Sequence, residues 1–161
     1  MKRLYFLIIA LGMTGALMSQ TPVNDDCSGL IDLGTAPFCT PDIFTNVGAT
    51  PTNIGSDNNP TCFNSGTAER DVWFMFTCPD TLFDFRITLT GVGNSIVNPE
   101  FAVYRGDCAV DGLAELLCAK ADIGENSLFL DVTGLTPGLQ YFIRVSDYSQ
   151  SASPNSGEFT L

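Results

Sequence analysis

Short apolar runs separated by Gly, Pro, Asn and Asp recur along the chain from residue 30 onward. The run at 71–78 (DVWFMFTC) is apolar at odd and even positions alike, as expected of a strand buried on both sides. No helical periodicity of useful length competes with this pattern beyond the first 20 residues. The next run, 82–90, alternates strictly, so its apolar side chains share one face of a strand: Phe83, Phe85, Ile87 and Leu89.

Further strands are predicted at 101–104, 113–119, 127–132, 140–145 and 157–161, with weaker ones at 30–33 and 43–47. Thr136-Pro137-Gly138 suits a type II turn, because Pro fixes the first central residue and Gly accepts a positive φ at the second. The longest irregular segment is 49–66. Many short, evenly spaced strands predict an all-β fold, a jelly-roll-like antiparallel β-sandwich.

The first residues have the order of a secretory signal peptide. A basic start (Met1-Lys2-Arg3) precedes an apolar run at 4–11, and small and polar residues follow. The apolar run is far shorter than the roughly 20 residues that a membrane-spanning helix needs. We expect residues 1–19 to be a cleaved signal peptide, although the sequence also allows cleavage after Ala16. Residues 20–161 are expected to form a single β-sandwich domain, secreted or at the cell surface.

The last residues, 159–161, fall in the middle of a predicted strand. Natural domains seldom end on a core-facing apolar residue without a polar tail. We therefore expect the sequence to be a fragment of a longer protein.

Six cysteines follow the signal segment, and an even number in an exported chain indicates disulfide bonds. Their spacings do not resemble zinc sites, and the chain has no histidine to complete a mixed site. The most local pairing joins Cys108 to Cys118 across a short polar loop. Cys27 with Cys39 is the next most local choice, and Cys62 with Cys78 follows by elimination.

The chain is strongly acidic, with a formal net charge of -11, and it becomes more acidic when Lys2 and Arg3 are removed. Such a surface repels phosphate backbones and anionic lipid heads, which argues against nucleic acid and membrane partners. It is compatible with cations and with neutral ligands. The expected partners are an extracellular polymer, a glycan or neighbouring domains of the same protein.

The residue inventory argues against an enzyme. Without histidine, the Ser-His-Asp and Cys-His arrangements are excluded, together with the commonest general base near neutral pH. Asp and Glu are scattered through turns, where they usually cap and solvate. Trp73 is expected in the core because its strand is apolar, which leaves Phe63 and Tyr148 as the candidates for exposed aromatic side chains.

Oxygen-rich side chains suggest a calcium site, since hard cations are bound by several oxygen ligands from flexible loops. Asn24 and Asp26 have a plainer alternative role, because they can simply form a turn before Cys27. The candidate ligands are Asn24, Asp25, Asp26, Asp57, Asn58 and Asp71.

An ordered set of segments resembles the bacterial pre-peptidase C-terminal (PPC-like) domain, in the form found in large secreted and surface proteins of the Bacteroidetes. The segments are 24–27 (NDDC), 70–76 (RDVWFMF), 101–104 (FAVY), 134–145 (GLTPGLQYFIRV) and 157–161 (GEFTL). The resemblance implies a jelly-roll-like β-sandwich with an accessory role, such as binding polymers, aiding secretion or spacing out neighbours. It also implies a further cysteine beyond residue 161, which leaves the partner of Cys62 open.

Calcium-binding members of that family use a segment leading into the first strand, together with acidic residues near the strand that carries Asp71. By resemblance, Asn24 and Asp25 match the leading pair and Asp71 matches loosely, whereas Pro22 and Val23 stand where glutamates are expected. The sequence therefore predicts a non-catalytic accessory extracellular module that contributes adhesion, stability or spacing. The alternative is a carbohydrate- or polymer-binding module, with calcium as its only candidate cofactor.

Overall fold

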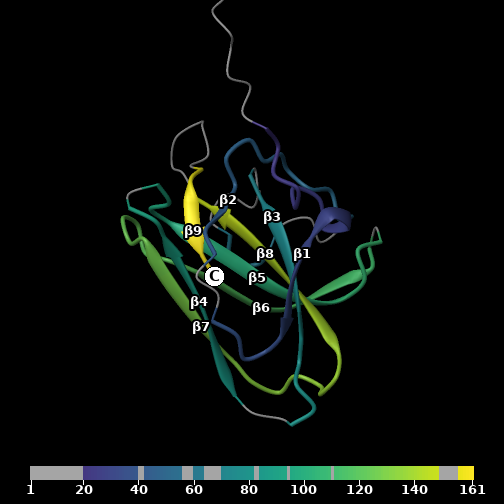
Figure 1. Cartoon of the computed structure of the whole chain (residues 1–161). Coiled ribbons are helices and arrows are strands. Elements are labelled where there is room, and N and C mark those ends of the chain that lie inside the picture. The colour runs from purple at the N-terminus through teal and green to yellow at the C-terminus, as the bar shows by residue number, and fades with distance from the viewer. Residues whose placement is uncertain are drawn as a thin grey trace, which may run out of the picture.

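The strands of the computed structural model form two sheets that pack face to face (Figure 1). The structure describes residues 20–39, 42–55, 60–63, 70–81, 84–93, 95–109, 111–148 and 156–161. Within these ranges the chain forms nine strands and one short 3-10 helix, η1 (Cys27–Gly29), but no α-helix. No helix of the described chain combines the length and the apolar character needed to cross a membrane. The prediction of an all-β sandwich is confirmed.

The larger sheet has five strands in the order β1-β3-β8-β5-β6, and the smaller has four in the order β2-β9-β4-β7. β1 runs parallel to β3, and every other pair of neighbours is antiparallel. The larger sheet contains β1 (Ile31–Thr35), β3 (Val72–Thr77), β5 (Pro99–Gly106), β6 (Leu113–Lys120) and β8 (Gln140–Asp147). The smaller sheet contains β2 (Phe44–Thr45), β4 (Phe85–Gly91), β7 (Ser127–Val132) and β9 (Glu158–Thr160).

Each predicted strand corresponds to one of these nine, with ends that differ by a few residues. The alternation in β4 has the expected result, because Ile87 and Leu89 are buried while Arg86 and Thr88 are exposed; Phe83 lies outside the described residues. The turn at 136–138 also forms: Leu139 N donates to Thr136 O (3.4 Å), and Gly138 has φ +74°. Both features fit a type II turn.

The inner faces of the two sheets enclose an aromatic core. Phe74 of the larger sheet packs edge-on against Phe44 and Phe159 of the smaller one, with ring centroids 4.8 and 6.0 Å away. Such edge-to-face pairs add to the stabilisation that comes from burying apolar area. Phe76, Ile143 and other alternate residues of β3 and β8 extend the same core.

A second apolar cluster lies on the outer face of the larger sheet, which explains why β3 is apolar on both faces from Val72 to Phe76. Trp73, Tyr104 and Phe142 form its base. Over them lies a covering layer, which we define as residues 20–30 together with the described parts of the irregular segment, 49–55 and 60–63. The layer contributes the buried side chains of Cys27, Ile54 and Phe63 to the cluster.

The covering layer explains two aromatic side chains. Trp73 has no exposed surface, as predicted, because the layer closes over it. The prediction that Phe63 is exposed was wrong: the residue is only 5% exposed and packs in the outer-face cluster. Tyr148 is half-buried.

Two disulfide bonds, Cys27–Cys108 and Cys62–Cys118, join the covering layer to the β5–β6 hairpin. They span 81 and 56 residues, much longer loops than those of the local pairings predicted from spacing. In the chain-entropy treatment each loop of this length corresponds to about 4 kcal/mol, against about 3 kcal/mol for a short one. Disulfides form and persist in oxidising compartments, so two of them suit an oxidising environment.

The three local pairings predicted from spacing were therefore wrong. Cys108 lies in the loop of the hairpin. Cys118 lies opposite Ala102, about 17 Å from the start of β6 at Leu113, given the usual rise per residue of a strand. Cys78 belongs to the inner core and Cys62 packs on the outer face, so the sheet separates them. Cys27 and Cys39 lie beyond opposite ends of β1. Cys39 and Cys78 are free thiols, and burial raises the pKa of Cys78.

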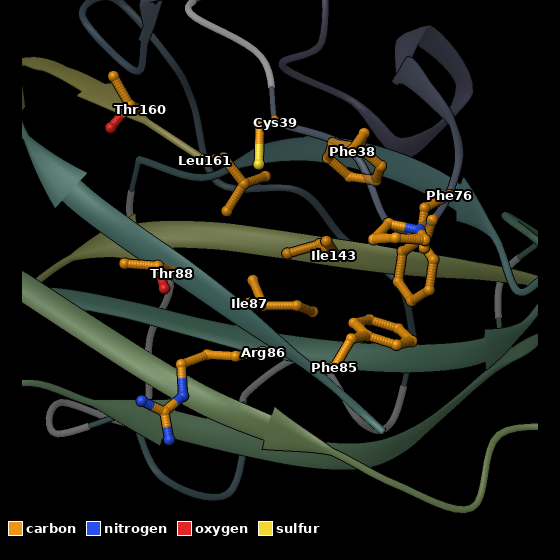
Figure 2. Close-up of a pocket in the computed structure, with 12 residues that line it drawn as sticks. Phe38, Cys39, Phe76, Phe85, Arg86, Ile87, Thr88, Ile143, Thr160 and Leu161 are labelled. Atoms are coloured by element: carbon orange, nitrogen blue, oxygen red, sulfur yellow. The ribbon is translucent and has the colours of Figure 1, made fainter. Parts of the chain in front are cut away.

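The sandwich has an apolar groove at one side, between β4, the end of β9 and the segment that follows β1 (Figure 2). Phe76 and Ile143 of the larger sheet form its floor, and Ile87 and Leu161 point into the same space. Its volume is about 280 Å³. The Arg86 side chain points away from it.

We predict that replacing Cys62 and Cys118 together by Ala lowers the free energy of unfolding by about 2–4 kcal/mol, because the covering layer loses a long-range cross-link. Urea denaturation of the oxidised protein measures the change. Cys39→Ala is the matched control and should leave the urea midpoint unchanged, since this thiol is exposed and unpaired. A non-reduced digest in which Cys39 is linked to another cysteine would contradict the disulfide assignment.

Candidate functional site

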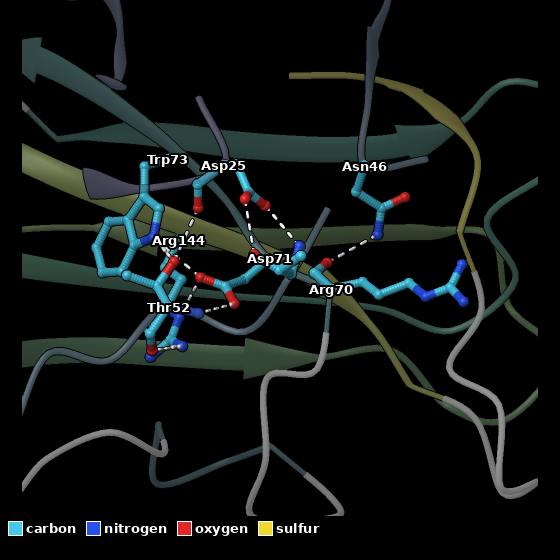
Figure 3. A network of polar contacts seen from close by, with 8 residues as sticks. Asp25, Asn46, Thr52, Arg70, Asp71, Trp73 and Arg144 are labelled. Atoms are coloured by element: carbon cyan, nitrogen blue, oxygen red, sulfur yellow. Dashed lines mark hydrogen bonds and ion pairs between the residues drawn. The ribbon is translucent and has the colours of Figure 1, made fainter. Parts of the chain in front are cut away.

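The outer face of the larger sheet contains a buried ion pair between Asp71 and Arg144 (Figure 3). Asp71 directly precedes β3, and Arg144 lies in the middle of β8, between Trp73 of β3 and Ala102 of β5. Arg144 Nε lies 2.9 Å from Asp71 Oδ2, and the two side chains are 1% and 0% exposed. Charges so deeply buried are tolerated only when they are paired and hydrogen-bonded.

Thr52 of the covering layer binds both partners of this pair. Its backbone N–H donates to Asp71 Oδ1 (3.0 Å), and its carbonyl accepts from Arg144 Nη2 (3.0 Å). The Trp73 indole N–H donates to Thr52 Oγ1 and to Asp71 Oδ2, both at 2.9 Å. The Thr52 hydroxyl in turn donates to the carbonyl of Asp25 (2.8 Å). Every polar atom of Thr52 is therefore used in attaching the layer to the sheet.

Asn24 and Asp25 hold the N-terminal part of the layer in the same way. Trp73 N donates to Asn24 O (2.8 Å), while Asn24 Nδ2 donates to Trp73 O (3.0 Å), so this asparagine pairs with β3 beside η1. The Asp25 carboxylate accepts from the backbone N–H and the hydroxyl of Thr50, at 2.6 and 2.7 Å. The covering layer is thus bound internally as well as to the sheet.

A neighbouring asparagine extends the polar contacts toward the smaller sheet. Asn46 has no exposed surface; its amide donates to Arg70 O (3.0 Å) and accepts from the backbone N–H of Gly157 (2.8 Å). Arg70 immediately precedes Asp71, and Gly157 immediately precedes β9. One buried side chain therefore connects the start of β3 with the start of β9.

Burial dominates the electrostatics at the ion pair. It raises the pKa of the Asp71 carboxyl above its ordinary value, while the Arg144 charge and the hydrogen bonds from Arg144 and Thr52 act in the opposite direction. Burial also raises the pKa of the adjacent Tyr104 hydroxyl to about 12, so this phenol stays protonated at any physiological pH. Neither group reaches solvent, and neither is placed to exchange protons with a substrate.

The structure brings the three principal calcium candidates, Asn24, Asp25 and Asp71, into one region, but it gives each of them protein partners. Asp26 is exposed, and Asp57 and Asn58 lie outside the described residues. Among the described side chains, no group of three from Asp, Glu and Cys is placed to hold a metal ion. The hydrogen bonds and the ion pair therefore favour a structural role for Asn24, Asp25 and Asp71.

Sequence reasoning missed Thr52 and Arg144. Arg144 did carry a signal, because it is the one charged residue in the apolar run 140–145 (QYFIRV), and a charge inside a buried strand requires a partner of opposite sign. Thr52 carried no such signal, since threonine is unremarkable in an irregular segment. Only the folding of the segment over the sheet gives it a role.

The outer face of the smaller sheet presents a second set of polar and aromatic side chains. Phe129 of β7 is 56% exposed, and the Arg86 guanidinium lies 3.9 Å from its ring centroid. Arg86 also donates two hydrogen bonds to Asp131, at 2.7 and 2.9 Å, which hold the pKa of that carboxyl below its ordinary value. Thr90 and Ser127 share a hydrogen bond further along the same strands (3.0 Å). We call this surface the β4–β7 face.

No family model matches the chain, and no curated protein is significantly similar to it in sequence. The function must therefore be argued from the residues themselves. Two features are available for that argument: the buried network under the covering layer and the exposed β4–β7 face.

We predict that Arg144→Met lowers the free energy of unfolding by about 3–5 kcal/mol, because the Asp71 carboxylate loses its buried charge partner. The double variant Asp71→Asn, Arg144→Met removes both charges and should regain a substantial part of the loss. Arg86→Met is the matched control: it breaks an ion pair whose side chains are 52% and 60% exposed, so its effect should be far smaller. Urea denaturation provides all three values.

The Arg144→Met defect should also depend on pH. Without Arg144, the folded-state pKa of Asp71 rises further above its unfolded value, so the folded protein gains stability on binding a proton. That gain is present below the unfolded pKa and is lost as the pH rises through the folded pKa. The difference from the wild type should therefore shrink as the pH is lowered. A difference that is the same at all pH values would show that the charge of Asp71 is not its cause.

Calcium binding by the sequence-predicted ligands has its own test. Since Asn24, Asp25 and Asp71 already have protein partners, we expect the same melting temperature in millimolar calcium and in chelator. Magnesium at equal concentration controls for ionic strength. A rise in calcium that Asp25→Asn abolishes would instead show that the ion displaces these hydrogen bonds.

Proposed function

We propose that this chain is a non-catalytic accessory module of a secreted or cell-surface bacterial protein, contributing stability and spacing. Its sandwich would be of the jelly-roll-like, PPC-like type. The observation that carries the proposal is the use made of the buried polar residues. The ion pair, its threonine and its asparagine all serve to fix the covering layer on the sheet, and none of them faces solvent.

The segments on which the family resemblance rests support the proposal of an accessory module. Asn24 comes from the first of them, Asp71 and Trp73 from the second, and Arg144 from the fourth. These residues meet in one buried network, so the shared pattern corresponds to a framework that attaches the layer. A pattern that specified a reactive site would converge on an accessible cleft instead.

The two disulfides suit an extracellular role. Outside the cytoplasm a domain is exposed to proteases without chaperones, and cross-links that span 81 and 56 residues restrict local opening of the layer. The high net negative charge keeps such a module soluble and discourages association with anionic surfaces.

The test is resistance to proteolysis. We expect the oxidised chain 20–161 to survive thermolysin under conditions in which the double variant Cys62→Ala, Cys118→Ala is cleaved within residues 49–66. Cys39→Ala is the control and should be as resistant as the wild type. Rapid cleavage of the oxidised wild type in this segment would refute the stabilising role of the layer.

A second candidate function is polymer binding at the β4–β7 face. The observation that favours it is Phe129, an exposed aromatic ring beside the guanidinium of Arg86 and the hydroxyls of Thr88, Thr90 and Ser127. Aromatic rings with adjacent polar groups are suited to stacking on sugar rings. However, Arg86 already occupies one side of the ring, which limits the area left for a sugar.

Sedimentation with insoluble cellulose, chitin and peptidoglycan distinguishes the two functions. A module that only stabilises and spaces should stay in the supernatant. Polymer binding at the β4–β7 face predicts a bound fraction that Phe129→Ala abolishes and that Leu139→Ala, at another exposed apolar residue, leaves unchanged. Binding that both variants retain would place the polymer elsewhere on the domain.

A further inference from the structure

A hollow lies at one end of the larger sheet, where no strand of the smaller sheet covers it. Its volume is about 520 Å³, within the range of small-molecule sites. The hollow shares no residue with the apolar groove or with the β4–β7 face. Its lining comes from the loop end of the β5–β6 hairpin and from the residues around the start of β8: Arg105, Gly106, Gly112, Ala114, Leu139 and Gln140.

The alternation of β5 explains why a charged side chain lines this hollow. Phe101 and Val103 belong to the inner core, and Arg105 follows them at the same parity. Unlike those two residues, Arg105 is exposed. The inner face of the larger sheet therefore continues beyond the core and ends in an arginine that the smaller sheet leaves open to solvent.

Arg105 has no protein partner within the part of the chain that the structure describes. Acidic residues outnumber basic ones by 18 to 7, yet no described carboxylate pairs with this arginine. The guanidinium fork, which matches the two oxygens of a carboxylate, is therefore available to a ligand. By contrast, each of the other described arginines donates to a protein group: Arg70, Arg86 and Arg144.

The other lining residues complement this charge. The Gln140 side chain forms no hydrogen bond within the described ranges, and its amide can both donate and accept, as a hydroxyl group requires of its partner. Leu139, which is 52% exposed, and Ala114 supply apolar surface for a carbon skeleton. The hollow thus combines one unpaired cation, one unpaired amide and a small apolar wall.

We propose that this hollow binds an acidic sugar, a ligand with one carboxylate beside several hydroxyl groups. The Arg105 guanidinium binds the carboxylate, and the Gln140 amide binds a neighbouring hydroxyl. The strongly acidic chain repels polyanions, whereas a single carboxylate meets the one unpaired arginine. An anion without hydroxyl groups would leave the amide unused. Because the hollow takes no part in attaching the covering layer, the inference does not depend on the proposed accessory role.

The first experiment tests the class of ligand. The probes are D-glucuronate and D-galacturonate, titrated into ¹⁵N-labelled protein while the Arg105 Nε–H and Gln140 amide signals are followed. We expect saturable shifts of both signals with at least one uronate. The matching neutral sugars, D-glucose and D-galactose, should bind at least about tenfold more weakly, because they lack the charge-assisted hydrogen bonds. Equal affinity for the neutral sugars, or no saturable shift with either uronate, would overturn the proposal.

The second experiment tests the residue. Arg105→Gln removes the charge at an exposed position, so it should weaken uronate binding at least about tenfold and leave the urea midpoint unchanged. Lys120→Gln is the matched control, because it changes the net charge equally at an exposed residue at the far end of β6 and should keep the affinity. Uronate binding that Arg105→Gln retains would overturn the proposal. An equal loss in both variants would also overturn it, because the cause would then be net charge alone.

Discussion

The Asp71–Arg144 ion pair is the constraint around which the outer face of the larger sheet is organised. Arg144 is placed in the middle of a buried strand, so its charge requires a carboxylate and its remaining donors require acceptors. Asp71 supplies the first, and the backbone of Thr52 supplies the second. Since Thr52 belongs to the irregular segment, satisfying the arginine fixes that segment over the sheet. The covering layer, the burial of Trp73 and the positions of Asn24 and Asp25 all depend on this arrangement.

The disulfides and the ion pair act on the same layer at different places. The ion pair holds Thr52 near the start of β3. The two disulfides attach Cys27 and Cys62 to the β5–β6 hairpin, which forms the opposite edge of the same sheet. The layer is therefore fastened at both sides of the face that it covers. The buried polar residues of the larger sheet therefore serve to attach the layer. On the smaller sheet, the β4–β7 face is exposed, with the Phe129 ring beside the Arg86 guanidinium.

The sequence was most informative where local pattern decides structure. Strand positions followed from alternation and turn residues, because each depends on neighbours within a few residues. The same alternation also contained information on the cysteines. Cys78 has the parity of Phe74 and Phe76, which face the inner core, whereas Trp73 and Met75 face the layer. Parity therefore places Cys78 on the inner face of β3, whereas only the tertiary structure places Cys62 on the outer face.

The sequence by itself determined the all-β class, the positions of the strands found in the described residues, a buried Trp73 and a turn at 136–138, since propensity and periodicity act over short distances. Only the tertiary structure decided which cysteines pair, that Asp71 faces Arg144 rather than an ion, and that Thr52 joins them. The physical reason is that these contacts join residues 19 to 92 positions apart, brought together by the stacking of sheet and layer. Such contacts leave no periodic trace in a single sequence.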